Sequence, residues 1–480
     1  MKKLSLLISI LLVTQLANAQ GPIINIPDAN FKSYLLFNFD VNWDGNIDST
    51  EAANVTGAIN TYNLNIADLT GIEAFTALTH LECSFNLLTS LDVSSNTALT
   101  YFDCHSNQLT TLDVSANTAL DYLQCSFNSI TTLDVSANTT LTYLDCGDNV
   151  LTSLDVSANT VLIYLGCYQN LLMNLDVSTN SALTDLECCN NQLTSLITSG
   201  DTALNFLWCC NNQLTALDVS SNTALDVLDC SNNQLTTLIT SGASPLNYLH
   251  CGWNQLTSLD FSANTKLANL YCYYNQLSSL ILLGDTALKY LHCFNNQLPT
   301  LDVSGNTALI ELACGINQLT SLDLSTHTAL HQFNCYGNQL TSLNVKNGNN
   351  TNLTAFNSMA NPNLFCIQVD NPAYSYSTAT WYKDSAAIYS TNCPVGIEVF
   401  YSADEIEIYP NPNNGEFTMN VLSQNGTLAI FNTLGEKIFS QTINRKHATV
   451  NCKQISQGIY FVNVFDGEKS YCKKLIVERN

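Results

Sequence analysis

Apolar and polar positions alternate along most of this chain in a unit of 21 residues that repeats thirteen times. Leu99, Cys104, Asn107 and Leu112 form one such set, with leucine five residues before a cysteine, asparagine three after it and leucine eight after it. The repeating cysteines are Cys83, Cys104, Cys125, Cys146, Cys167, Cys188, Cys209, Cys230, Cys251, Cys272, Cys293, Cys314 and Cys335. A fixed period of this length is typical of a solenoid, in which each turn buries its apolar edge against its neighbours.

Each unit has two halves of similar design. One reads L-x-x-L-x-C-x-x-N, as in Leu120 to Asn128, and the other reads L-x-x-L-D-V-S-x-N, as in Leu109 to Asn117. The alternation predicts a short strand in each half, and the asparagine is expected to satisfy backbone groups of the turn that follows. Because the halves have ten and eleven residues, we expect a thin solenoid of parallel strands with weak curvature.

These units resemble leucine-rich repeats, and in particular the nested 21-residue class called IRREKO, with cysteine in place of the third leucine. The resemblance covers residues 56–346 and implies a β-rich leucine-rich-repeat solenoid of thirteen repeats. The chain length adds little to this fold prediction, because a solenoid grows without enlarging its core.

The first residues, 1–19, have a basic start, an apolar run from Leu4 to Leu16 and the small residues Ala17 and Ala19. This pattern is typical of a secretory signal peptide, with cleavage expected before Gln20. No later segment has eighteen consecutive apolar residues, so the sequence predicts an exported protein without a membrane-spanning segment.

Residues 20–55 are expected to form a small helical cap in which Asp28 begins a helix. The loop after this helix resembles an EF-hand calcium loop. The residues that match its ligand positions are Asp40, Asn42, Asp44, Asn46, Asp48 and Glu51, with Gly45 at the sharp turn. The resemblance implies one structural Ca²⁺ site. A loop that serves only as a helical cap is the alternative.

The repeats give way at residues 347–395 to a segment rich in asparagine and proline, which we interpret as a C-terminal cap over the last apolar edge. Residues 396–480 then show short alternating strands separated by Pro-Asn-Pro, Asn-Gly and Asp-Gly turns, which predict a small antiparallel β-sandwich.

This last segment resembles the C-terminal sorting domain of bacterial type IX secretion substrates. The matching motifs are Tyr409-Pro410-Asn411-Pro412, Gly458-Ile459-Tyr460 and the terminal run Lys473 to Val477. The resemblance implies interaction with the type IX machinery and removal of the domain. The protein would then be released or attached to surface lipopolysaccharide. An accessory adhesive β-domain is the alternative.

Nineteen cysteines in an exported chain call for an explanation. The thirteen periodic cysteines lie at inward strand positions, where cysteine packs as a small apolar side chain, so we expect them to be reduced. The other six pair by neighbourhood, and the predicted disulfides are Cys189–Cys210, Cys366–Cys393 and Cys452–Cys472.

Charge limits the partners. The formal net charge is −24, and the only basic residues between Gly57 and Val345 are Lys266 and Lys289. Such a surface repels phosphate groups, so we exclude nucleic acids and anionic membranes as partners.

Outward strand positions carry many aromatic residues. We expect a ligand-binding face formed by Tyr101, Tyr122, Tyr143, Tyr164, Phe206, Trp208, Tyr248, Tyr271 and Tyr290. Tyrosine and tryptophan suit protein partners or sugar rings, although stacked tyrosines can also stabilise a sheet without any ligand. A second outward column of aspartates, among them Asp113 and Asp134, is expected to bond local backbone N–H groups, with calcium bridging as the alternative.

No catalytic motif stands out, and His250 and His292 lie two repeats apart. The sequence therefore predicts a non-catalytic secreted or surface protein that binds a protein or glycan through its aromatic face, with adhesion as the most concrete role. A structural spacer without a specific ligand and a carbohydrate-capture protein are the alternatives.

Overall fold

The computed structural model describes residues 21–393, 407–420, 426–433, 436–445, 447–465 and 470–479. The predicted signal peptide, residues 1–19, lies outside them. The described chain forms two compact units. One contains the residues up to Phe365 together with Val369–Ile388, and the other contains Cys366–Gln368 and the residues from Tyr389 onward.

The first unit is a solenoid built around one parallel sheet of sixteen strands, here called the inner sheet. Its strands, in order, are β1 (Ala58–Asn60), β2 (His80–Glu82), β3 (Tyr101–Asp103), β4 (Tyr122–Gln124), β5 (Tyr143–Asp145), β6 (Tyr164–Gly166), β8 (Asp185–Glu187), β10 (Phe206–Trp208), β12 (Val227–Asp229), β14 (Tyr248–His250), β16 (Asn269–Tyr271), β18 (Tyr290–His292), β19 (Glu311–Ala313), β21 (Gln332–Asn334), β23 (Ala355–Asn357) and β25 (Trp381–Tyr382). The parallel solenoid predicted from the period is confirmed.

In eight of the thirteen repeats the second half also forms a short strand, and these are here called the outer strands. These are β7 (Asn174–Asp176), β9 (Ser195–Ile197), β11 (Ala216–Asp218), β13 (Thr237–Ile239), β15 (Ser258–Asp260), β17 (Ser279–Ile281), β20 (Ser321–Asp323) and β22 (Ser342–Asn344). Three two-stranded sheets are formed by β7 with β9, β11 with β13 and β15 with β17, and β20 pairs with β22 in a larger sheet. Two more short strands, β24 (Cys366–Gln368) and β26 (Ile388–Ser390), follow them in the chain.

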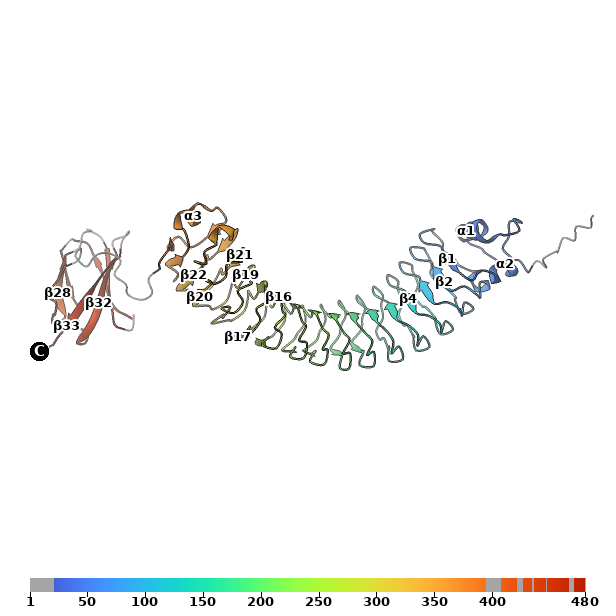
Figure 1. Cartoon of the computed structure of the whole chain (residues 1–480), viewed down its shortest axis with the longest axis horizontal. Helices are drawn as coiled ribbons and strands as arrows, with labels where there is room; N and C mark the ends of the chain where they lie inside the picture. Colours follow the sequence, from blue (N-terminus) through green and yellow to red (C-terminus); the bar gives the residue numbers. More distant parts are fainter. Residues whose placement is uncertain are drawn as a thin grey trace, which may run out of the picture. The chain divides into compact units, whose positions relative to one another are not determined.

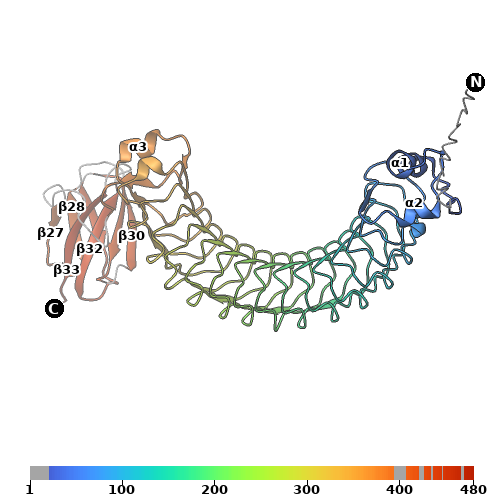
Figure 2. The ribbon, with the colours of Figure 1, turned by 45° about the vertical axis from the view of Figure 1, so that its right-hand side comes forward.

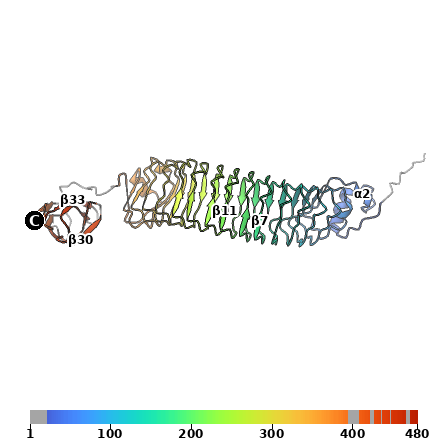
Figure 3. The same ribbon diagram turned by 90° about the horizontal axis from the view of Figure 1, so that it is seen from below.

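The solenoid unit bends into an arc, with β16 on its inner side and β17 on its outer side (Figure 1). Figure 2 shows the same bend, and Figure 3 shows the turns stacked side by side along the unit. The near-equal halves of the repeat predict only weak curvature, but the arc is plain in these views. The inner strands pair without interruption, whereas the outer strands pair only in small groups, so the two sides of a turn are not equivalent.

The core consists of stacked columns, one residue of each kind per turn. Leu123, the middle residue of β4, and Cys125 are fully buried, as are the equivalent leucines and cysteines of the other repeats. All thirteen periodic cysteines are free thiols, as expected. Burial raises the pKa of these thiols, that of Cys167 to about 12, so they stay protonated and pack as apolar groups.

Asparagine side chains join successive turns. The Asn128 amide Nδ2 donates to the carbonyls of Cys125 in its own turn and Cys104 in the preceding turn, both at 3.1 Å. Its Oδ1 accepts from the backbone N–H of Leu109 at 2.9 Å. Each asparagine of this column therefore satisfies backbone groups that the turns would otherwise leave unpaired, as the sequence predicts.

Helices cover the start of the solenoid. Helix α1 (Ala29–Phe39) begins at Asp28, whose side chain accepts from the N–H groups of Asn30 and Phe31, and buries Phe31 and Leu35. Two more helical segments follow near the start, α2 (Ser49–Ala53) and η1 (Ile72–Ala74). Near the end of the solenoid lie η2 (Asn350–Asn352) and α3 (Pro372–Ser377).

The segment predicted as a C-terminal cap extends the inner sheet by two strands, β23 and β25, in which Phe356 pairs with Trp381. The Asp384 carboxylate accepts from the backbone N–H groups of Ala360 and Asn361 at 2.9 and 2.7 Å. Asp370 does the same for Gly348 and Asn350, both at 2.9 Å. Two carboxylates thus take the place that a further turn would fill.

The second unit contains an antiparallel sandwich, as predicted. One sheet has β27 (Glu407–Tyr409), β28 (Glu416–Asn420) and β31 (His447–Asn451), and the other has β29 (Gly426–Phe431), β30 (Lys437–Ile443), β32 (Gly458–Phe465) and β33 (Ser470–Val477). The side chains of Phe417, Met419, Leu428 and Val462 are among those that fill the core between them.

Candidate binding surface

Every three-residue strand of the inner sheet buries its second side chain and leaves its first exposed or half-buried, and the third is buried only in β3, β5 and β6. In β4, Tyr122 and Gln124 face outward on either side of buried Leu123. The nine aromatic residues predicted to form a binding face all occupy such first or third positions. Their surroundings divide eight of them into two groups, and the ninth, Tyr290, makes no ring contact within the described chain.

Five rings on consecutive strands form one group, here called the tyrosine stack: His80, Tyr101, Tyr122, Tyr143 and Tyr164. Neighbouring ring centroids lie 3.9, 4.3, 4.3 and 4.5 Å apart, with planes within 8° of parallel. The Tyr122 hydroxyl donates to Gln124 Oε1 at 2.6 Å. Because the rings cover one another's faces, the stack offers a partner mainly ring edges, and it stabilises the sheet by roughly 0.2–1 kcal/mol per pair.

Carboxylates accompany this stack. Asp103 is buried and lies 2.6 Å from His105 Nδ1, and this hydrogen bond raises the pKa of His105. Asp145 is also buried and accepts from the Gly147 N–H at 3.0 Å, and its burial raises its pKa. Burial, together with the nearby Asp145 charge, raises the pKa of Tyr143 to about 12. These side chains are already occupied by intramolecular contacts.

The aromatic side chains further along the sheet are arranged differently, and we call this group the open aromatic region: Phe206, Trp208, Tyr248, Trp253, Tyr271, Tyr273, Tyr274 and Phe294. Phe206 is 39% exposed and Trp208 is 44% exposed. Tyr271 meets Tyr248 at a 46° tilt and 5.5 Å between centroids. Phe206 and Trp208 therefore leave ring surface accessible, whereas Trp253 stacks on Tyr274 and Tyr273 stacks on Phe294.

Four members of the open aromatic region are not among the nine residues predicted from the sequence: Trp253, Tyr273, Tyr274 and Phe294. Trp253 and Tyr274 lie two residues after the periodic cysteine, where the backbone φ is 56° and 50°. Asparagine holds this left-handed position in several other turns, at Asn190, Asn211, Asn232 and Asn295. The sequence signal that could have revealed Trp253 and Tyr274 is a large aromatic residue two positions after the periodic cysteine, where most repeats have a polar residue.

Histidine–carboxylate pairs lie beside these rings. His292 Nε2 is 2.9 Å from Glu311 Oε1, and His250 Nδ1 is 3.4 Å from Asp229 Oδ2. His250 Nε2 also lies 2.9 Å from the Tyr273 hydroxyl. Nowhere in the described part of the chain do three or more His, Cys, Asp or Glu side chains come together in a way that could hold a metal ion.

On the outer side, each aspartate of the predicted column bonds locally. Asp113 Oδ1 accepts from the Ser115 N–H at 2.9 Å, and the Ser115 side chain and N–H together lower the Asp113 pKa. The other aspartates of the column accept in the same way from the N–H of the equivalent serine: Asp92, Asp134, Asp155, Asp176, Asp218, Asp260, Asp302 and Asp323. The expectation of local backbone bonding is confirmed.

The predicted calcium loop folds around its own backbone. Asp40 Oδ2 accepts from the Gly45 N–H at 3.0 Å, and Asn42 Oδ1 accepts from the Asp44 N–H at 2.8 Å. Glu51 forms a capping box with Asp48 and also accepts from the Val41 N–H at 2.9 Å. Asp44 Oδ1 accepts from the Asn46 N–H at 2.9 Å. The second oxygen of Asp40, Oδ1, is buried without a hydrogen-bond partner in the described chain.

Comparison with known proteins agrees with this geometry. A structure titled as the functional domain of InlJ from Listeria monocytogenes, which includes a cysteine ladder, is 30% identical, with a TM-score of 0.66, and the match covers 96% of this chain and 99% of that one. The chain belongs to the internalin-like leucine-rich repeat proteins.

Two further matches are narrower. Internalin J of Listeria monocytogenes serotype 4b is 40% identical over 70 residues, which are 15% of this leucine-rich repeat protein and 8% of the length of that relative. The plant peptide hormone receptor RGFR1, solved in complex with RGF2, is 20% identical with a TM-score of 0.54 over 70% of this chain and 62% of that one. The second match shows the fold alone.

The C-terminal part has its own match. Residues 407–478 fit the family model described as a secretion system C-terminal sorting domain. This leucine-rich repeat protein is therefore a type IX secretion substrate, directed to the cell surface or released. Among the described residues, no helix has both the length and the apolar character needed to cross a membrane.

The structure joins two of the three cysteine pairs predicted for this leucine-rich repeat protein. Cys189 bonds to Cys210 on the neighbouring turn, and Cys366 bonds to Cys393. The Cys452–Cys472 pairing is not formed, and both residues are buried free thiols. Cys452 follows β31 in one sheet of the sandwich, whereas Cys472 lies in β33 of the other sheet, so nearness in sequence does not bring them together.

Proposed function

We propose that this protein is a non-catalytic surface or secreted recognition protein that binds another protein through the open aromatic region, in an adhesive role. The single observation that carries the proposal is the exposure of Trp208 and Trp253, at 44% and 48%, on the same stretch of solenoid. Tryptophan and tyrosine are enriched among the residues that dominate binding energy at protein interfaces.

The net charge of the protein indicates the charge of the surface that it binds. With a net charge of −24 and almost no basic side chains along the repeats, the solenoid attracts a protein whose contact surface is positively charged. In this proposal the tyrosine stack stabilises the solenoid and does not bind the partner, because its ring faces are covered. We therefore expect only small contributions to binding affinity from the stacked tyrosines Tyr101, Tyr122, Tyr143 and Tyr164.

The test uses the purified chain beginning at Gln20, probed on an array that holds extracellular proteins and glycans. The variant W208S/Y274S is expected to lose binding at least tenfold, whereas the matched variant Y122S/Y143S keeps its binding and melts at a lower temperature. Equal loss in both variants would contradict the division into two regions. Absence of binding by the unmutated chain would favour the spacer alternative.

A calcium site in the N-terminal loop remains a separate proposal. The oxygen donors of Asp40, Asn42, Asp44 and Asp48 suit Ca²⁺, and the unpartnered Asp40 Oδ1 favours a bound cation. Glu51 would have to exchange its hydrogen bond to Val41 for the metal. A rise in melting temperature with Ca²⁺ that is absent in D40N supports the site, and an equal response in D40N excludes it.

A further inference from the structure

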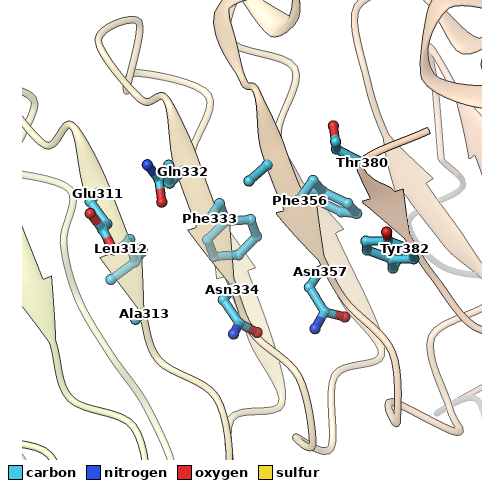
Figure 4. A pocket seen from close by; sticks show the side chains of 11 residues that line it. Glu311, Leu312, Ala313, Gln332, Phe333, Asn334, Phe356, Asn357, Thr380 and Tyr382 are labelled. Carbon is cyan, nitrogen blue, oxygen red and sulfur yellow. The ribbon is translucent and has the colours of Figure 1, made fainter. Parts of the chain in front are cut away.

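A hollow lies on the inner sheet near the end of the solenoid, away from the open aromatic region. It spans strands β19, β21, β23 and β25 and has a volume of about 280 Å³. Glu311, Gln332, Asn334, Asn357, Thr380 and Tyr382 stand around it (Figure 4). Its floor is the sheet itself, whose inward residues Phe333 and Phe356 are buried.

Small side chains create the hollow. Ala355 follows Gln332 in the column that carries tyrosine in β3 to β6, and Ala313 precedes Asn334 in the other outward column. A ring at either position would fill the space. The apolar surface between the polar side chains therefore results from two alanines where other turns have large residues.

Two carboxamides on adjacent strands are held in a fixed orientation. Asn334 Oδ1 accepts from the Tyr336 N–H at 3.0 Å, and Asn357 Oδ1 accepts from the Met359 N–H at 3.1 Å. Within the described chain their Nδ2 groups have no hydrogen-bond partner, and Figure 4 shows the two amides side by side in the same orientation. They are donors set in place before any ligand arrives.

The remaining groups define the ligand's charge. None of the described residues that line the hollow is basic, so they offer an anion no positive charge to pair with. The one charged residue, Glu311, is already bonded to His292 at 2.9 Å. Gln332 can donate and accept, and Tyr382, which is 53% exposed, presents its ring at the last strand.

We propose that this hollow binds a neutral sugar unit of a glycan. The Asn334 and Asn357 amides donate to ring hydroxyls, Gln332 bonds a further hydroxyl, and the C–H face of the sugar packs on Tyr382. An extended peptide lying across the strands fits less well. Its like-facing carbonyls repeat at about 6.7 Å, whereas the two amides are one strand spacing apart, about 4.8 Å.

This site uses none of the residues of the proposed protein-binding surface, so the two can be tested separately. The probes are soluble neutral oligosaccharides of glucose, galactose and mannose, with uronic-acid and sulfated oligosaccharides as charged controls, titrated into the purified chain from Gln20 by calorimetry. The variants are A355Y, which fills the hollow without removing a hydrogen bond, and Q332A, with W208S as the control outside it. Circular dichroism and melting curves check that each variant folds.

We expect at least one neutral oligosaccharide to bind, with affinity at least tenfold lower in A355Y, several-fold lower in Q332A and unchanged in W208S. Unchanged affinity in folded A355Y overturns the proposal, as does stronger binding of the charged oligosaccharides. Failure of every neutral probe to bind overturns it too. If A355Y does not fold, Q332A alone decides, because an exposed glutamine is not needed for folding.

Discussion

The indole ring of Trp253 lies flat against the phenol ring of Tyr274, with centroids 3.8 Å apart and planes 10° apart. Both residues hold a left-handed backbone conformation, which costs a large side chain roughly 1–2 kcal/mol. Both are also well exposed, at 48% and 39%. Strain combined with exposure of apolar surface is typical of residues kept for binding rather than for stability.

Replacing Trp253 with asparagine tests this interpretation, because asparagine holds the same position in other turns. In W253N the relief of backbone strain offsets the lost ring contact, so the free energy of unfolding is expected to change by less than about 1 kcal/mol. Affinity for a protein partner should fall at least tenfold. Urea unfolding and binding to an array-identified protein measure the two effects. A loss of stability above about 2 kcal/mol would make Trp253 a structural residue.

The tyrosine stack should behave in the opposite way. Tyr143 contacts Tyr122 and Tyr164, at 4.3 and 4.5 Å between centroids, so Y143S is expected to lower the free energy of unfolding by about 1–2 kcal/mol. The matched control is Y290S, since Tyr290 makes no ring contact within the described chain. Equal stability losses in urea unfolding would remove the distinction between stacked and unstacked tyrosines.

The asparagine column should be a larger source of stability than any ring pair. N128A removes the bonds to Cys104, Cys125 and Leu109 and leaves buried backbone groups unpaired, which costs about 1–3 kcal/mol for each unsatisfied group. Amide hydrogen exchange should accelerate locally at Leu109. The exposed neighbour Gln108 provides the control, and Q108A is expected to leave exchange unchanged.

A buried aspartate should make stability depend on pH. Asp201 lies where the second half of most repeats has a buried asparagine such as Asn117. Both its carboxylate oxygens lack hydrogen-bond partners in the described chain, and burial raises its pKa to about 7. The unfolded side chain ionises near pH 4, so the folded state binds the proton more tightly. Stability therefore falls as pH rises from about 4 to 7.

The variant D201N removes this ionisation. We expect it to raise the free energy of unfolding by up to about 4 kcal/mol at pH 8 and to change it little at pH 4. Urea unfolding at the two pH values measures the difference. D113N is the control, because local hydrogen bonds lower the pKa of Asp113. A benefit of D201N that is equal at both pH values would contradict the assignment.

Alkylation can count the free thiols directly. Four of the nineteen cysteines form disulfides and fifteen are free. Alkylation of the unfolded chain without reductant should modify fifteen residues, Cys452 and Cys472 included. Peptide mass spectrometry reads the sites. Only thirteen modified cysteines, with those two protected, would restore the third disulfide predicted from the sequence.

Much of the fold could be predicted because each buried residue packs mainly on the equivalent residues of the two adjacent turns. Leu123, Cys125 and Asn128 recur at a constant interval, so a single turn defines the others. The burial of ring faces in the stack depends on how side chains of adjacent turns rotate, which the interval does not specify. The hollow was missed because Asn334 pairs with Asn357 after 23 residues, and Asn357 with Tyr382 after 25, so the regular spacing no longer identifies the column.

The carboxylates of Asp384 and Asp370 accept the N–H groups that one more turn would otherwise bond. These two carboxylates close the last turn of the solenoid. No residue within the repeats specifies how many units come before them. Whole 21-residue units can be duplicated or lost upstream, and the same two side chains will still close the last one. The number of turns in the solenoid can therefore change without altering the helix that begins at Asp28 or the closing carboxylate of Asp384.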